Sequence, residues 1–140
     1  MDPLTAFLRA AARVFGKLAP RLRMKSSVKG EQLSRDDTVG EAYFADPLVH
    51  LSPTARFGWA LLDAMTTARR DVSGITTPTL AIHGADDSLV PPSASASLAG
   101  VPGVERKLFP GLRHELHNEP EQREVLEFVA RWIEDRLDVG

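Results

Sequence analysis

Apolar side chains recur every three or four positions in the first half of the chain, which predicts two amphipathic helices. The first covers residues 3–19 and ends before Pro20. The second begins at Ser52 and Pro53, a serine N-cap followed by proline at the first helical position, and runs to about residue 70. Residues 21–52 are irregular, with a short helix expected over residues 39–44. The face of the first helix is rich in large apolar residues, so we expect something to cover it.

The pattern changes in the second half to that of an α/β unit. Residues 78–83 form a short, nearly continuous apolar run, which is typical of a buried parallel strand. A short helix over residues 91–99 leads to a second strand over residues 105–109, and Asn118 can cap a final helix. Strand, helix, strand and helix in this order predict the α/β class. The first strand is apolar enough to expect neighbours on both sides, and the sequence supplies one.

Composition narrows the function classes. The chain has 140 residues, 43% of them apolar and 26% charged, which fits one globular domain. The net charge of −2 argues against a nucleic-acid partner, and the basic bias of residues 9–29 is interpreted as a solvated helix face rather than a membrane surface. Cysteine is absent, and no apolar run is long enough to span a membrane. Without a visible signal peptide, we expect a cytoplasmic protein.

Two segments carry candidate chemistry. Residues 83–92 leave the first predicted strand and present an aspartate, and residues 109–120 leave the second and present a histidine. Loops at the carboxyl ends of parallel strands hold the functional site of α/β proteins, so the two side chains can meet. A carboxylate that accepts a hydrogen bond from one imidazole nitrogen leaves the other nitrogen free to take a proton from a nucleophile. The segments therefore predict an acid–base pair.

The sequence also resembles a known family. The resemblance covers most of the chain, from residues 33–49 to residues 118–120, and includes a His-Gly-x-x-Asp and a Gly-x-x-His-x-x-x-Asn-Glu pattern. In these residues the sequence resembles bacterial monoacylglycerol lipases and lysophospholipases of the α/β-hydrolase fold. The resemblance implies that Asp87 is the triad acid and His114 the triad base. It also implies a helical cap over residues 1–72 and, over residues 73–140, a core segment with the last two parallel strands of the fold.

One departure from the family concerns the nucleophile. The family carries its serine in a G-x-S-x-G elbow, and no such motif occurs in this sequence. The oxyanion-hole loop and the earlier strands of the fold are missing as well. We therefore expect the chain to correspond to a truncated member that supplies the acid and the base but not the serine.

Other residues of these types have simpler interpretations. Asp86 competes with Asp87 but is expected to be exposed, and His117 is expected at the surface. The side chain of His83 is expected to bond loop backbone, and His50 has no assigned role. Ser88 and Ser93 lie near the predicted pair without an elbow, which disfavours either as a replacement nucleophile. No histidine pair has a strong metal-ligand spacing, so neither a metal nor another cofactor is predicted.

Three functional hypotheses remain open. The first is a carboxylic-ester hydrolase fragment that acts on a small, lipid-like acyl ester and has little or no activity alone. The second is an association module that forms a homo-oligomer, or complements a serine-bearing N-terminal half, through an unpaired strand edge and uncovered helix faces. The third is acid–base hydrolysis of activated esters by the aspartate–histidine pair without a serine.

Overall fold

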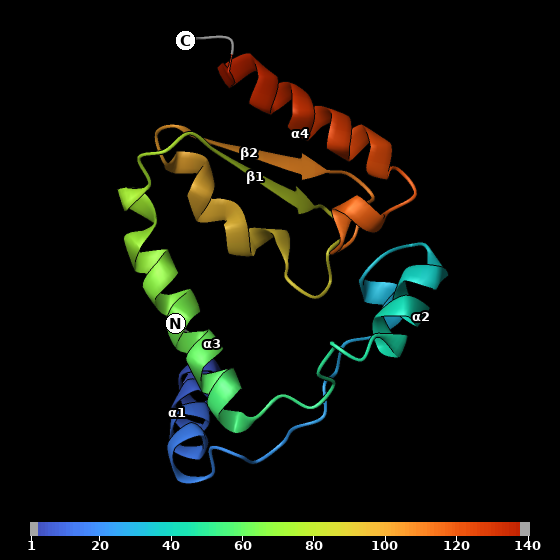
Figure 1. Cartoon of the computed structure of the whole chain (residues 1–140). Helices are drawn as coiled ribbons and strands as arrows, with labels where there is room; N and C mark the ends of the chain where they lie inside the picture. Colours follow the sequence, from blue (N-terminus) through green and yellow to red (C-terminus); the bar gives the residue numbers. More distant parts are fainter. Residues whose placement is uncertain (1–2, 138–140) are drawn as a thin grey trace. The chain divides into compact units, whose positions relative to one another are not determined.

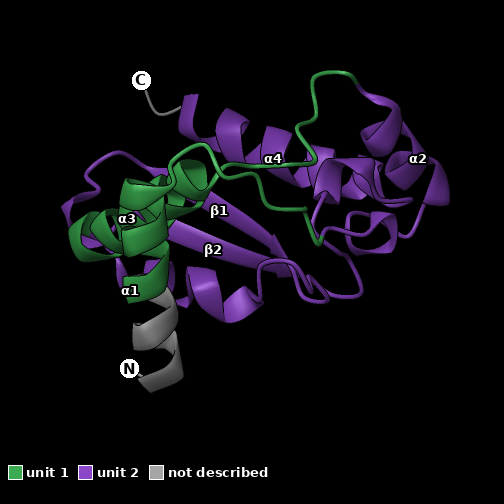
Figure 2. Ribbon diagram, turned by 90° about the horizontal axis from the view of Figure 1, so that it is seen from below, with its two compact units in different colours: residues 1–27, 47–71 green, residues 28–46, 72–140 purple. Residues whose placement is uncertain are grey.

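The computed structural model describes the backbone of residues 3–137 and the side chains of residues 10–137. Its contacts divide the chain into two compact units, Met1–Ser27 with Pro47–Asp71 and Val28–Asp46 with Val72–Gly140 (Figure 2). The predicted domain boundary, between a helical cap of residues 1–72 and a core segment of residues 73–140, stays a prediction. The units divide the chain differently because residues 28–46 group with the C-terminal part.

The first unit contains two helices, α1 (Pro3–Leu18) and α3 (Ala55–Asp71) (Figure 1). Both helices were predicted from their apolar spacing. They approach closely at Gly16, where an added Cβ would lie 2.7 Å from the Cβ of Trp59. A glycine at this point lets the two backbones come together around the indole. The apolar side chains expected at residues 4, 7 and 8 lie outside the described side chains.

Helix α3 begins later than its sequence indicated, so the prediction of Ser52 as the N-cap is wrong. The backbone before the helix forms an antiparallel bridge, in which the carbonyl of Pro53 accepts a hydrogen bond from the amide of Met24 at 2.9 Å. The capping contact comes instead from Thr54, whose hydroxyl oxygen accepts from the amide of Phe57 at 3.2 Å. Pairing with a distant segment therefore overrides the local serine–proline signal.

The second unit contains two parallel strands, β1 (Thr79–Gly84) and β2 (Val104–Phe109). A 3₁₀ turn (Val72–Gly74) precedes β1, and a 3₁₀ helix (Pro92–Gly100) connects the strands. Helix α4 (Gln122–Leu137) lies on one face of the strands and the 3₁₀ helix on the other (Figure 1). The predicted order of strand, helix, strand and helix is confirmed, with a connecting helix of 3₁₀ type.

Strand β1 is less buried than its apolar sequence indicated. Most of its residues are half-buried, and within residues 3–137 it pairs with β2 alone. The prediction of a fully buried strand is therefore wrong for this chain, because no second strand covers its other edge.

The apolar core of the second unit lies between the strands and α4. Its buried members are Phe109, Leu112, Leu116 and Val125, with Ile82 and Phe128 packed against them. The rings of Phe109 and Phe128 meet edge to face with centroids 5.7 Å apart. This core joins the end of β2, the loop after it and α4, so it fixes the loop that contains His114.

Helix α4 also begins later than predicted. Asn118 lies in a 3₁₀ turn (Leu116–Asn118) and donates its side-chain amide to the carboxylate of Glu115 at 2.7 Å. It is not the N-cap of α4, which starts at Gln122. The residues before the helix are instead engaged in contacts with residues 33–36.

Residues 28–46 contain a 3₁₀ turn (Gly30–Gln32) and the helix α2 (Asp37–Ala45). The predicted short helix over residues 39–44 is thus confirmed. Asp36 caps it, because its carboxylate accepts from the amide of Thr38 at 2.9 Å. The 3₁₀ turn and the residues before the cap bond to the loop that follows β2, which places this segment beside the candidate site.

Candidate active site

The two predicted site loops leave the same end of the sheet. The parallel register places Gly84, the last residue of β1, beside Phe109, the last residue of β2. The loop after β1 carries Asp87 and the loop after β2 carries His114 (Figure 1). The carboxyl ends of adjacent parallel strands therefore bring the acid and the histidine within reach of each other.

Asp87 is held by the backbone of its own loop. One carboxylate oxygen, Oδ1, accepts from the amides of Leu89 at 2.9 Å and Val90 at 2.8 Å. Its side chain is 3% exposed. Burial alone raises the pKa of this carboxyl, but the Val90 amide, the His114 ring and the Leu89 amide together outweigh burial and hold the pKa below its ordinary value. Asp87 is therefore a carboxylate at neutral pH.

His114 contacts the other oxygen of that carboxylate. Its Nδ1 lies 2.8 Å from Oδ2 of Asp87. A carboxylate only accepts hydrogen bonds, so Nδ1 carries the proton and Nε2 of the neutral ring holds a lone pair. The His114 side chain is 38% exposed, and among the described residues no hydrogen bond occupies Nε2. The ring is thus oriented at one nitrogen and available as a base at the other.

A small cavity adjoins the pair. It has a volume of about 160 Å³ and is lined by Ile82, His83, Gly84, Asp87, Val90, His114 and Leu116. All of these residues come from the end of β1 or from the two loops. The cavity is large enough for a few atoms of a reacting group rather than for a whole lipid.

A second imidazole touches the acid. Nε2 of His83 lies 2.8 Å from the carbonyl oxygen of Val90 and 3.3 Å from Oδ2 of Asp87, and Nδ1 lies 2.9 Å from the Ser95 hydroxyl. The side chain is 11% exposed. The expected bond to loop backbone is therefore present. The contact with Asp87 was missed, because the sequence shows the strand end but not the direction in which the loop folds back.

Glu119 is the buried charge that sequence reasoning missed. Its side chain is 0% exposed and accepts hydrogen bonds from the amides of Arg113 at 2.6 Å and Arg35 at 3.1 Å. Nε of Arg35 also donates to it at 3.1 Å, and the Ser34 hydroxyl oxygen lies 3.4 Å from it. The sequence placed Glu119 in the first turn of the last helix. The residues next to Glu119 in the sequence do not show that its carboxylate accepts hydrogen bonds from Arg35, which lies 84 residues away along the chain.

Gly84 allows the two loops to approach. A Cβ at this position would overlap the carbonyl oxygens of Leu112 and Arg113, so only glycine fits without movement of the backbone. Beyond it, the amide of Asp86 donates to the Leu112 carbonyl at 3.0 Å. The glycine of the His-Gly-x-x-Asp pattern is thus required by the packing of the His114 loop on the end of β1.

The candidate residues not yet described are exposed. Asp86, His117, His50 and Ser93 are exposed, as is Ser88, whose hydroxyl accepts from Nε2 of Gln32 at 3.3 Å. The predictions of an exposed Asp86 and a surface His117 are therefore confirmed. Neither serine forms a hydrogen bond with His114 among the described residues.

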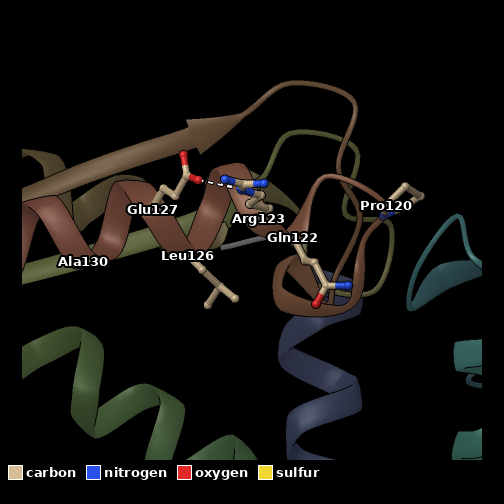
Figure 3. Close-up of a pocket in the computed structure, with 6 residues that line it drawn as sticks. All are labelled: Pro120, Gln122, Arg123, Leu126, Glu127 and Ala130. Atoms are coloured by element: carbon tan, nitrogen blue, oxygen red, sulfur yellow. Dashed lines mark hydrogen bonds and ion pairs between the residues drawn. The ribbon is translucent and has the colours of Figure 1, made fainter.

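A larger hollow lies over the outer face of α4 and shares no residue with the small cavity. It measures about 600 Å³ and is lined by Pro120, Gln122, Arg123, Leu126, Glu127 and Ala130. Figure 3 shows Leu126 and Gln122 extending away from the helix, while Arg123 and Glu127 pair with each other at 2.8 Å. An ion pair one helical turn apart and a single leucine do not offer reactive groups, so size does not identify the reactive site here.

Comparison with known proteins agrees with the resemblance seen in the sequence. The model of the Hydrolase_4 family, described as serine aminopeptidase, S33, matches residues 1–121. The chain belongs to this family of α/β-hydrolases. The match begins at the first residue and ends just after Glu119, so it includes both halves of the aspartate–histidine pair.

Several relatives of this chain are named monoacylglycerol or monoglyceride lipases. A monoacylglycerol lipase from Mycolicibacterium smegmatis is 37% identical over 140 residues, which are 97% of this chain and 50% of that protein. A putative monoglyceride lipase from Schizosaccharomyces pombe is 30% identical over 131 residues, covering 90% of this chain and 35% of that protein. The crystal structure of Paleococcus ferrophilus monoacylglycerol lipase superposes with a TM-score of 0.82 at 28% identity, over 90% of this chain and 51% of that one.

These matches show that the chain has a partial α/β-hydrolase fold and is similar to monoacylglycerol lipases. The chain spans about half the length of the bacterial relative and of the archaeal structure. Within the described part of the chain, no helix has the length and apolar character needed to cross a membrane.

Proposed function

We propose that this chain supplies the orienting acid, Asp87, and the general base, His114, of a serine ester hydrolase that acts on lipid-like esters such as monoacylglycerols. The observation that carries the proposal is the contact of 2.8 Å between Nδ1 of His114 and Oδ2 of Asp87, with Nε2 left open. In this arrangement the base is oriented before a nucleophile or a substrate arrives. The substrate class follows the named activity of the relatives.

The chemistry follows from the proton positions. Nε2 of His114 takes the proton of a serine hydroxyl as that oxygen attacks the ester carbonyl, and the ring becomes an imidazolium. Asp87, which stays ionised because its pKa lies below the ordinary value, stabilises that positive charge. The same nitrogen then returns the proton to the leaving alcohol. A water molecule, activated by the same ring, releases the acid in the second half of the reaction.

The serine has to come from a polypeptide segment that this sequence does not contain, because no G-x-S-x-G elbow is present. Neither Ser88 nor Ser93 forms a hydrogen bond with His114 among the described residues. We therefore expect this chain by itself to hydrolyse a short-chain nitrophenyl ester at the background rate. A serine-directed phosphonate should not label it.

The decisive experiment adds the missing part. The chain is mixed, or expressed together, with the portion of the M. smegmatis relative that it does not match, and hydrolysis of nitrophenyl butyrate and of a monoacylglycerol is followed. We expect activity from the mixture alone, and a loss of at least about a thousandfold on His114→Ala or on replacement of the elbow serine. His117→Ala, an exposed histidine three residues away, is the matched control and should leave the rate unchanged.

Two outcomes would contradict the proposal. Activity of the mixture that survives His114→Ala would show that another group is the base. Turnover by the chain alone that is insensitive to the phosphonate and abolished by His114→Ala would favour hydrolysis by the pair without a serine.

A second candidate function is supported by the open edge of β1. Within residues 3–137 that edge has no strand beside it, and its unpaired backbone groups form a template for strand addition. This function is an association module that binds a second copy of the chain or a serine-bearing half through β1. Size-exclusion chromatography with light scattering tests self-association, and a monomer at micromolar concentration would contradict the homo-oligomer.

A further inference from the structure

We propose that Glu119 is a positioning residue that sets the place of His114, through a carboxylate bridge between the His114 loop and residues 31–36. The inference rests on the proposed function, in which His114 is the base. It adds a residue that does not touch the reacting groups and acts through the backbone beside the base.

The bridge begins at the residue before His114. Oε1 of Glu119 accepts from the amide of Arg113 at 2.6 Å, and Oε2 accepts from both the amide and Nε of Arg35 at 3.1 Å. The two oxygens of one side chain therefore serve two chain segments, and each oxygen fixes one of them. Any shift of Arg113 relative to Arg35 would break a bond to a charged acceptor.

Further hydrogen bonds between residues 31–36 and the His114 loop reinforce the bridge on both sides of His114. The amide of Glu115 donates to the Leu33 carbonyl at 2.8 Å, and the Ser34 hydroxyl donates to the Asn118 carbonyl at 2.9 Å. Nη1 of Arg113 reaches the carbonyls of Glu31 at 2.5 Å and Ser34 at 3.0 Å. His114 lies between Arg113 and Glu115, both of which are tied to this segment.

Because Glu119 is buried, its negative charge has a large effect on the stability of this arrangement. An ionised carboxylate away from water costs free energy unless donors compensate it, so the arrangement is stable only while its partners stay in place. Arg35 provides the compensating charge and also pairs with Glu121. Hydrogen bonds to a charged group are stronger than those between neutral groups, which gives the bridge a defined geometry.

The Asp87 carboxylate is held by donors other than those of the bridge. It bonds to the amides of Leu89 and Val90 and lies 3.3 Å from Nε2 of His83, and none of these groups hydrogen-bonds to Glu119 in the described part of the chain. The two loops are also joined by the bond from the Asp86 amide to the Leu112 carbonyl, but no bond to the Asp87 carboxylate depends on Glu119. Loss of Glu119 should release the base while the acid stays in place.

Nuclear magnetic resonance of the whole ¹⁵N-labelled chain distinguishes these two sets of hydrogen bonds. Ring-nitrogen shifts report which nitrogen of His114 carries the proton, and amide exchange reports the opening of each loop. In Glu119→Ala we expect exchange at Arg113 and Glu115 to rise at least about tenfold, the factor implied by loss of one charge-assisted hydrogen bond. Exchange at Leu89 and Val90 should stay within about twofold, because these two amides donate to Asp87 rather than to Glu119. The His114 ring should change from one tautomer to a mixture.

Three further variants complete the design. Glu119→Gln keeps one carbonyl acceptor for the Arg113 amide, so it should restore part of the protection and part of the tautomer preference. Arg35→Ala weakens the bridge from a partly exposed position and serves where Glu119→Ala does not fold. Val101→Ala removes a buried side chain just before the start of β2, at the opposite end of that strand from the His114 loop, and should lower the melting temperature while His114 keeps its single tautomer.

The outcomes distinguish this inference from the proposed function. A folded Glu119→Ala or Arg35→Ala chain that keeps the wild-type His114 tautomer and the wild-type exchange at Arg113 would overturn the positioning role. The same holds if Val101→Ala, at equal loss of melting temperature, changes His114 as much as Glu119→Ala does. If instead Asp87→Asn leaves the His114 tautomer unchanged, the proposed acid–base pair fails, whatever Glu119 does.

Discussion

In the helix pair α1 and α3, large apolar side chains are exposed to solvent. In the loops around His114, by contrast, charged side chains are buried. Leu18, at the end of α1, is 81% exposed, and Phe57 and Leu61 on α3 are about half-exposed. In the second unit Glu119 and Asp87 are buried with their hydrogen bonds satisfied. A buried charge tolerates one arrangement of its partners, but an exposed apolar face does not specify what covers it. Hydrogen bonds within the chain therefore fix the loops around His114, whereas the apolar face of the helix pair is left exposed.

The largest effect should come from the core under the His114 loop. Phe109→Ala removes a buried ring at the end of β2, and we expect the free energy of unfolding to fall by about 3–5 kcal/mol. Denaturant unfolding followed by the fluorescence of Trp132, on α4, measures it. A loss similar to that of an exposed apolar substitution in α1 would remove the contrast between the two units.

The next effect should come from the close approach at Gly84. Gly84→Ala pushes a methyl group against two backbone carbonyls of the His114 loop, which should cost about 2–3 kcal/mol. The Asp87–His114 bond should weaken at the same time, and the ring-nitrogen shifts of His114 report this. Gly100→Ala is the matched control, because a Cβ there meets nothing within 4 Å. Equal losses for the two variants would show that the loops are not packed as described.

A smaller, pH-dependent effect should follow from Asp87. Its pKa is lower in the folded chain than in the unfolded one, where a carboxyl titrates near pH ~3.9. The native state then binds fewer protons, so the stability from this group is present above that pH and is lost as the pH falls through the folded pKa. Asp87→Asn, which keeps the oxygen that accepts from Leu89 and Val90, should cost about 1 kcal/mol at neutral pH.

Melting temperatures measured between about pH 3 and pH 7 test this, because acid denaturation follows such carboxylates. The difference between wild type and Asp87→Asn should shrink toward low pH. Asp86→Asn, an exposed neighbour, should follow the wild-type curve. A difference that grows toward low pH would reverse the direction assigned to the pKa of Asp87.

The smallest effect should come from the exposed helix face. Leu18→Ser changes a side chain that is almost fully in water, so the free energy of unfolding should move by no more than about 0.5 kcal/mol. If a second copy or a serine-bearing half covers this face, the same substitution should weaken that association. A large loss of stability in the monomeric chain would show that the face is already covered within the chain.

Sequence reasoning recovered what is encoded locally. Apolar spacing gave both amphipathic helices, and the apolar run at residues 78–83 with the strand at residues 105–109 gave the parallel pair. The rule that site loops leave the carboxyl ends of strands brought candidate residues to one edge, and the resemblance selected Asp87 and His114. Their contact is visible in the structure, and their catalytic roles stay predictions.

What sequence reasoning missed depends on contacts between distant segments. The cap moved from Ser52 to Thr54 because the preceding backbone pairs with residues 22–26. The start of α4 moved because Glu119 is occupied by Arg35 and Arg113. No local sequence pattern distinguishes a glutamate in the first turn of a helix from one that forms hydrogen bonds with two separate loops. A multiple alignment would be the natural signal, since paired changes at positions 35 and 119 would report the contact.

The separation of Arg35 and Glu119 along the chain also has a consequence in time. The two residues are 84 positions apart, and a ribosome adds about 5–20 residues per second, so Glu119 is made about 4 to 17 seconds after Arg35. During this interval residues 31–36 lack the loop on which they dock, and isolated helices of the length of α2 are marginal in water. We expect the surroundings of the base to be ordered late in synthesis, once α4 follows Glu119 out of the ribosome.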